Sequence, residues 1–142
     1  MLSLFSKTPT WHKVTDAPLS LDWQSNNMCI VEVADKKITL GKFQDQIFAF
    51  AQKCPHASGI MADGFIDAAG MVVCPLHRYR FSLQNGRNTS GEGYYLKTYP
   101  TQMREDGLYF GWPLIQPQEL CMTMLFFMIK LPQAILFSIV GF

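Results

Sequence analysis

Four side chains of this sequence could together bind a metal: Cys54, His56, Cys74 and His77. They form two pairs, Cys54-Pro-His56 and Cys74-Pro-Leu-His77, and seventeen residues separate the first pair from the second. Cysteine thiolates and histidine imidazoles are ligands for zinc and for iron, and four of them can saturate a metal site. Because the chain has only three histidines and four cysteines, this grouping predicts a metal centre.

The order of the ligands within each pair distinguishes two kinds of centre. A Cys2His2 zinc site usually takes its cysteines from one element and its histidines from another. Here each pair holds one of each, with C-x-H spacing in the first and C-x-x-H spacing in the second. This pattern resembles the signature of the Rieske family, in which two cysteines hold one iron of a [2Fe–2S] cluster and two histidines hold the other. Zinc stays open as the alternative.

The residues around the two pairs extend the resemblance to Rieske proteins. It is dense from Cys54 to Gly86 and weaker over the longer stretch from Trp11 to Trp112. The resemblance implies an all-β Rieske fold, a small antiparallel β barrel or sandwich with an inserted cluster-binding lobe at about residues 53–87. It also implies one [2Fe–2S] cluster per chain, with the two Cys/His pairs as its ligands and backbone N–H groups of both loops pointing at sulfur.

Alternation of apolar and polar residues predicts β-strands along most of the chain. Before the metal-binding segment we expect strands at 11–15, 28–34, 37–43 and 46–51, and a short helical or irregular connection at 18–25. After it we expect strands at 94–99, 101–104 and 108–112, with a hairpin turn at 105–107. Together with the lobe, these strands form one predicted domain, residues 1–113, which positions the metal-binding loops.

Composition limits the classes of function. The length of 142 residues suits one domain, and a formal charge of +1 argues against a surface for nucleic acid. Residues 1–11 lack the basic and apolar regions of a signal peptide, and free thiolates suit a reducing compartment, so we expect a cytoplasmic protein. Cys29 lies in an apolar strand pattern and is predicted to be buried, whereas His12 is predicted to be a surface or edge-strand residue.

An apolar extension, residues 114–142, follows the predicted domain, and its composition becomes strongly apolar at Leu120. The 23 residues from 120 to 142 are enough for one membrane-spanning helix, which needs about 20. Lys130 at the centre would cost roughly 2.5–3.5 kcal/mol, which a dozen large apolar residues at about 0.3–0.6 kcal/mol each could offset. Three alternatives stay open: a membrane tether, an apolar helix packed on the domain or on a partner, and a segment without selected structure.

The Rieske resemblance implies electron transfer, and the sequence narrows its kind. An oxygenase α-subunit needs a second iron site with two further histidines, but only His12 remains. Cytochrome-bc Rieske proteins have an extra cysteine in each loop, where this chain has Gly59 and Leu76. They also have hydroxyl groups at the positions of Tyr79 and Phe81. Because phenylalanine cannot donate a hydrogen bond, we expect a low reduction potential.

We therefore expect a one-electron carrier, the electron-transfer component of an oxidoreductase system and not an enzyme by itself, with no catalytic residue of its own. It would resemble soluble ferredoxins, which pass electrons from a reductase to an oxygenase or a similar acceptor. His56 and His77 are expected at the exposed side where electrons leave, with both cysteines on the inner iron. Arg78, where many soluble relatives have glycine, would add positive charge beside this docking site.

Two other functions remain compatible with the sequence. The segment Cys54–Gly59 also resembles the small subunit of an assimilatory nitrite reductase, a stable partner of a sirohaem-containing large subunit. The second alternative is a non-redox binding module stabilised by zinc. Stoichiometric co-purification of a large subunit would identify the first, and zinc without iron would identify the second.

Overall fold

The computed structural model describes residues 8–112, and β-strands dominate this part of the chain. The described helices are two single 3-10 turns, η1 (Pro18–Ser20) and η2 (Met61–Asp63). None of the helices in this range is long and apolar enough to cross a membrane. The all-β prediction is therefore confirmed. The predictions for the extension at 114–142, the membrane tether among them, lie outside the described residues.

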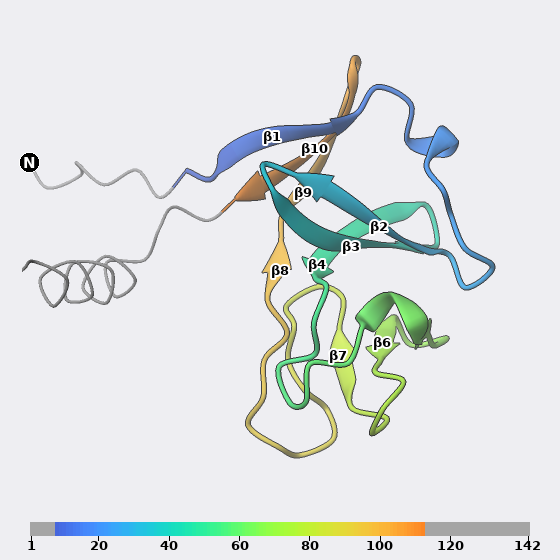
Figure 1. Cartoon of the computed structure of the whole chain (residues 1–142), viewed down its shortest axis with the longest axis vertical. Coiled ribbons are helices and arrows are strands. Elements are labelled where there is room, and N and C mark those ends of the chain that lie inside the picture. The colour runs from blue at the N-terminus through green and yellow to red at the C-terminus, as the bar shows by residue number, and fades with distance from the viewer. Residues whose placement is uncertain (1–7, 113–142) are drawn as a thin grey trace, which may run out of the picture. The chain divides into compact units, whose positions relative to one another are not determined.

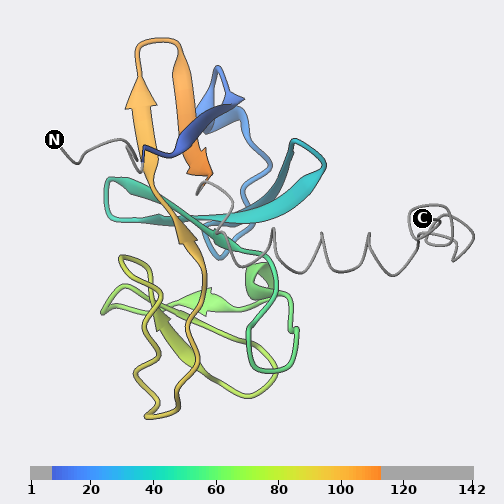
Figure 2. The same ribbon diagram turned by 90° about the vertical axis from the view of Figure 1, so that its left-hand side faces the viewer.

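The strands of the described residues form three antiparallel sheets (Figures 1 and 2). The first sheet has the order β1-β10-β9, formed by Thr10–Thr15, Gly107–Trp112 and Thr101–Arg104. The second has the order β2-β3-β4-β8, formed by Met28–Val33, Lys36–Phe43, Gln46–Ala51 and Thr98–Tyr99. The third has the order β5-β6-β7, formed by Phe65–Ile66, Met71–Val73 and Arg80–Ser82. The third sheet belongs to the lobe predicted at residues 53–87.

The second sheet packs against both other sheets because it is apolar on both faces. Successive residues of a strand point to opposite faces of its sheet. In β2, Met28 packs with residues of the lobe, whereas Cys29 packs with the first sheet. In β4, Phe50 packs with the residues of the lobe and Ala49 packs with the first sheet. The second sheet therefore contributes to both hydrophobic cores and connects the lobe to the first sheet. The predicted burial of Cys29 is confirmed.

The predicted strands match the structure closely, with one exception. Six of them agree with β1–β4, β9 and β10 to within one residue at each end. The strand predicted at 94–99 is shorter, because only Thr98 and Tyr99 pair with β4. Just before them, the N–H of Leu96 donates to the carbonyl of Gly86 at 2.9 Å. Tyr95, which bridges to Arg87, and Leu96 are therefore bound to the lobe, whereas the carbonyl of Lys97 accepts from the N–H of Ala51 at the end of β4.

Candidate metal centre

The two predicted metal-binding loops, residues 54–59 and 74–79, have the same backbone hydrogen bonds. In the first loop, the N–H of Cys54 donates to the carbonyl five residues later at 2.8 Å, and its carbonyl accepts from the N–H four residues later at 2.9 Å. In the second loop, Cys74 makes the equivalent bonds at 2.9 Å and 3.1 Å. The first loop follows β4, and the second joins β6 to β7. The sheets thus present two matching loops side by side.

The two cysteines lie together at the buried base of these loops. Cys54 is 2 % exposed and Cys74 is 1 % exposed, and their thiols are within hydrogen-bonding reach of each other. Burial raises the pKa of the Cys54 thiol, while the backbone N–H groups of His56 and Ala57 donate to its sulfur and act in the opposite direction. N–H groups therefore point at sulfur in the first loop, as the family resemblance implies. A bound metal would supply the positive charge that holds the thiolates deprotonated.

The two histidines form a second pair, and their exposure differs. The rings of His56 and His77 meet edge to face, with centroids 4.9 Å apart. His77 is exposed, whereas His56 is half-buried. Within the described residues, Nδ1 of His56 is buried without a hydrogen-bond partner. A buried nitrogen in that state costs free energy unless something binds it. Its position therefore fits a metal ligand.

The arrangement of these residues fits a binuclear cluster. They present a cysteine pair and a histidine pair, and a [2Fe–2S] centre of mixed ligation needs one pair for each iron. Gly59 leaves room beside the sulfurs, because a Cβ at this position would lie 3.0 Å from Sγ of Cys74 and 2.9 Å from Cδ1 of Leu76. Within residues 8–112, no group of three or more His, Cys, Asp or Glu side chains is close enough to hold a single metal ion.

Sequence reasoning missed the neighbours of His56. The Tyr79 ring lies 4.4 Å from the His56 ring, and the Tyr94 ring lies 5.2 Å from it. The Tyr79 hydroxyl donates to Oε2 of Glu92 at 2.7 Å, and this hydrogen bond is the main reason that the pKa of Tyr79 rises to about 12. The hydroxyl is therefore engaged with Glu92, and Phe81 is fully buried without a donor. No local pattern pairs Tyr79 with a residue thirteen positions away.

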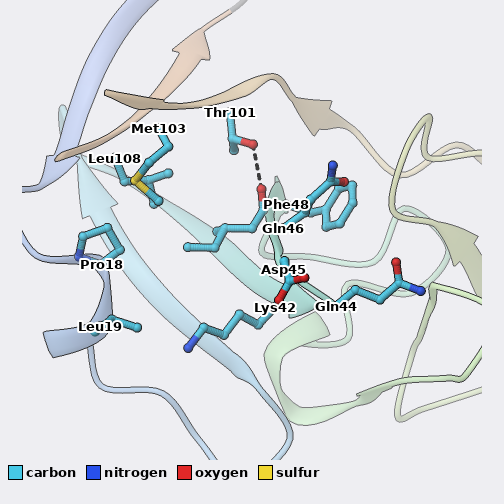
Figure 3. Close-up of a pocket in the computed structure, with 11 residues that line it drawn as sticks. Pro18, Leu19, Lys42, Gln44, Asp45, Gln46, Phe48, Thr101, Met103 and Leu108 are labelled. Atoms are coloured by element: carbon cyan, nitrogen blue, oxygen red, sulfur yellow. Dashed lines mark hydrogen bonds between the residues drawn. The ribbon is translucent and has the colours of Figure 1, made fainter. Parts of the chain in front are cut away.

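A surface pocket of about 700 Å³ lies elsewhere and contributes nothing to this centre (Figure 3). Its walls come from η1, the end of β3, the turn after it, the start of β4, and the strands β9 and β10. Thr101 and Ile47 connect two of these walls through a hydrogen bond of 2.6 Å from the threonine hydroxyl to the isoleucine carbonyl. No histidine or cysteine lines the pocket.

Asp67 organises the hairpin between β5 and β6, next to the second loop. Its Oδ1 accepts from the N–H of Ala69 at 2.9 Å and from that of Met71 at 3.1 Å, and its Oδ2 pairs with the Arg80 guanidinium. Burial of the carboxyl opposes ionisation, but the N–H donors and Arg80 prevail and lower its pKa. The carboxylate therefore stabilises the folded lobe.

We expect Asp67→Ala to lower the free energy of unfolding by about 1–2 kcal/mol at pH 7. Asp67→Asn should cost less, because its amide oxygen can still accept from the backbone. The folded pKa lies below the unfolded value of about 3.9, so the stabilisation is complete above that pH and is lost as the pH falls below it. Urea unfolding of the three proteins at neutral and acidic pH checks this. An equal loss in both variants would show that the backbone bonds contribute nothing.

Comparison with known proteins agrees with this geometry. The sequence profile of the Rieske [2Fe–2S] domain matches residues 11–100. The ferredoxin component of a naphthalene 1,2-dioxygenase system from Pseudomonas aeruginosa is 32 % identical over 74 residues, which are 51 % of this chain and 70 % of that protein. A nitrite reductase [NAD(P)H] from Emericella nidulans is 32 % identical over 95 residues, 61 % of this chain but only 9 % of that protein.

The fold is similar to that of a solved structure from a dioxygenase system. The solved complex of reduced oxygenase and oxidised ferredoxin in carbazole 1,9a-dioxygenase contains a chain that superposes with a TM-score of 0.55 at 22 % identity. The match covers 63 % of this chain and 93 % of that one. The profile match spans all but the first residue of β1, the strands β2–β8 and both Cys/His loops. The chain therefore belongs to the Rieske [2Fe–2S] domain family.

Proposed function

We propose that Cys54, His56, Cys74 and His77 hold the [2Fe–2S] cluster, and that the protein carries single electrons from a reductase to an oxygenase or a similar acceptor. The observation that carries this proposal is the pair of matching loops, which bring two buried cysteines and two adjacent imidazoles together. The dioxygenase ferredoxin component that the chain resembles supports the choice of acceptor.

The residues around the ligands support a carrier of low reduction potential. When bound, the cluster supplies reversible one-electron transfer. Hydrogen bonds to its sulfurs would stabilise the reduced form, but Phe81 has no donor and the Tyr79 hydroxyl donates to Glu92. The buried cysteines cannot meet a partner, whereas the exposed His77 can. His56 is half-buried, so the expectation that both histidines are exposed holds for only one of them.

We also propose the division into a domain, residues 1–113, and an extension, residues 114–142, and a cytoplasmic location. The three described cysteines are free thiols, which suits a reducing compartment. Membrane contact through residues 120–142 belongs to this proposal as an alternative. Comparing the full chain with a chain that ends at residue 113 in a vesicle flotation assay tests the contact.

The function is tested on purified protein. We expect about two irons per chain, labile sulfide, visible absorbance that bleaches on reduction, and an electron paramagnetic resonance signal after uptake of one electron. The reduced protein should pass its electron to a Rieske-type oxygenase. Colourless protein that contains zinc and no iron would instead establish the zinc-stabilised module.

A second candidate is the electron-transfer subunit of a nitrite reductase, favoured by the 32 % identity to the Emericella nidulans enzyme. In that case the domain would work in a stable complex with a larger subunit. Affinity purification from the native cell distinguishes the two functions. A stoichiometric large subunit supports the nitrite reductase assignment, whereas a chain that purifies alone supports the ferredoxin.

Arg78 places positive charge next to His77 at the exposed side of the lobe. Its φ of 61° is in the left-handed region that favours glycine, the residue that the family resemblance implies at this position in many soluble relatives. The arginine keeps this backbone conformation although it costs free energy. Its side chain is exposed, and its guanidinium lies 6.0 Å from the Phe65 ring.

We expect Arg78→Gln to slow oxidation of the reduced protein by ferricyanide, an anion, roughly two- to fivefold at low ionic strength. Glutamine is used because it removes the charge without relieving the backbone as glycine would. The difference should vanish at high salt, and a cationic oxidant should not be slowed. Arg104→Gln, the same charge change in β9, is the control. An equal effect of both variants would mean that only net charge matters.

A further inference from the structure

A third loop, residues 88–95, covers the half-buried histidine of the centre. Two backbone hydrogen bonds anchor its ends, from the N–H of Thr89 to the Arg80 carbonyl at 3.0 Å and from the N–H of Leu96 to the Gly86 carbonyl at 2.9 Å. Both anchors lie on the lobe itself. The ends of the third loop are therefore fixed, and its middle has to be held by other contacts.

The middle of the third loop has little backbone support of its own. Glu92 lies between Gly91 and Gly93, and a Cβ added to either glycine would meet nothing within 4 Å. Gly91 also has a φ of +88°, which few other residues adopt. Two glycines in open space give a segment many accessible conformations, and ordering it costs conformational entropy. A specific side-chain contact has to offset this cost.

Glu92 and Tyr94 make the contacts that hold this segment. The Glu92 carboxylate accepts the hydrogen bond of the Tyr79 hydroxyl at 2.7 Å. The Tyr94 ring meets the Tyr79 ring edge to face, with centroids 5.8 Å apart, and meets the His56 ring at 5.2 Å. Tyr79 is the common partner, since its own ring lies 4.4 Å from His56. The aromatic cover on His56 thus consists of one ring from the second loop and one from the third.

We infer that the Tyr79–Glu92 hydrogen bond is a clasp that closes the third loop over His56, so that a redox partner reaches the centre through His77. This inference rests on the proposed function, because both histidines have a redox role only if they are cluster ligands. Tyr79 and Glu92 are positioning residues. They touch no partner, and they determine which imidazole edge is open to one.

The clasp is tested with four variants of the full-length, cluster-loaded protein. Tyr79→Phe removes only the hydroxyl and keeps the ring against His56. Glu92→Ala removes the acceptor, and Glu92→Gln keeps an oxygen acceptor without the charge. Tyr95→Phe is the control, because it removes a hydroxyl from a tyrosine of the same loop that is 65 % exposed. The readouts are hydrogen–deuterium exchange of residues 88–95 and the rate at which EDTA bleaches the visible absorbance.

We expect Tyr79→Phe and Glu92→Ala to increase both rates roughly three- to tenfold, the effect of losing one charge-assisted hydrogen bond. Glu92→Gln should restore most of the protection, and the control should match the wild-type protein. Wild-type rates in Glu92→Ala would overturn the clasp, and so would equally fast rates in Glu92→Ala and Glu92→Gln. Iron content and the resonance signal of the wild-type protein test the proposed function separately, so the two ideas can fail independently.

Discussion

His77→Ala is expected to purify without the visible absorbance of a [2Fe–2S] cluster and with far less than the wild-type content of about two irons per chain. His77 is exposed and its ring meets those of His56 and Tyr79, so its loss should leave the fold intact. Three remaining ligands cannot complete the coordination of both irons. Iron analysis, visible spectroscopy and far-ultraviolet circular dichroism together separate loss of the cluster from loss of the fold.

His12→Ala is the matched control, since it removes the only histidine outside the proposed ligand set. His12 lies in β1, where its ring stacks on Phe110 at a centroid distance of 5.7 Å, in the first sheet. This variant should lose some packing energy and keep its spectrum. Bleaching of His12→Ala together with an unchanged His77→Ala would show that the ligand assignment is wrong.

The second large effect is expected from Gly86→Ala. The carbonyl of Gly86 accepts the hydrogen bond from the N–H of Leu96. An added Cβ would lie 1.8 Å from the carbonyl oxygen of Leu96, and the φ of +72° already disfavours a side chain. The obstacle is backbone, which cannot rotate away as a flexible side chain could. The variant has to break the hydrogen bond between Leu96 and Gly86 and disturb a core residue that is 2 % exposed.

We expect this substitution to cost roughly 3 kcal/mol or more, a large part of the 5–15 kcal/mol that stabilises a typical domain. Gly91→Ala is the control, because its φ of +88° is similar but no atom lies within 4 Å of the added Cβ. It should cost only about 1 kcal/mol, from the backbone conformation. Thermal unfolding of the two proteins measures the difference. Equal midpoints would mean that the lobe yields at Gly86 without penalty.

The clasp and Arg78 both affect which histidine of the centre a redox partner can approach. The clasp limits access to His56, and Arg78 adds charge beside His77. Both features direct a partner to one edge of the centre. If the clasp variants open the loop, the charge at Arg78 should matter less for ferricyanide oxidation, because a second edge becomes accessible. Combining Tyr79→Phe with Arg78→Gln measures this coupling.

Much of the fold was predictable because its signals are local. The alternation in residues 28–51 marked three strands whose ends match the structure to within one residue. The strand predicted at 94–99 was too long, because the alternation does not reveal that Leu96 bonds to Gly86. A residue's backbone partner ten positions away is set by the packing of the lobe, and no periodicity encodes it.

Residue types and short spacings were enough to indicate the family and the proposed ligand set. The sequence also determined that Phe81 offers no donor, because that property belongs to the side chain alone. The half-buried position of His56, the exposure of His77 and the hydrogen bond from the Tyr79 hydroxyl to Glu92 depend on how the lobe packs. These features arise where segments distant in sequence pack together, so their outcome depends on the geometry of the whole lobe.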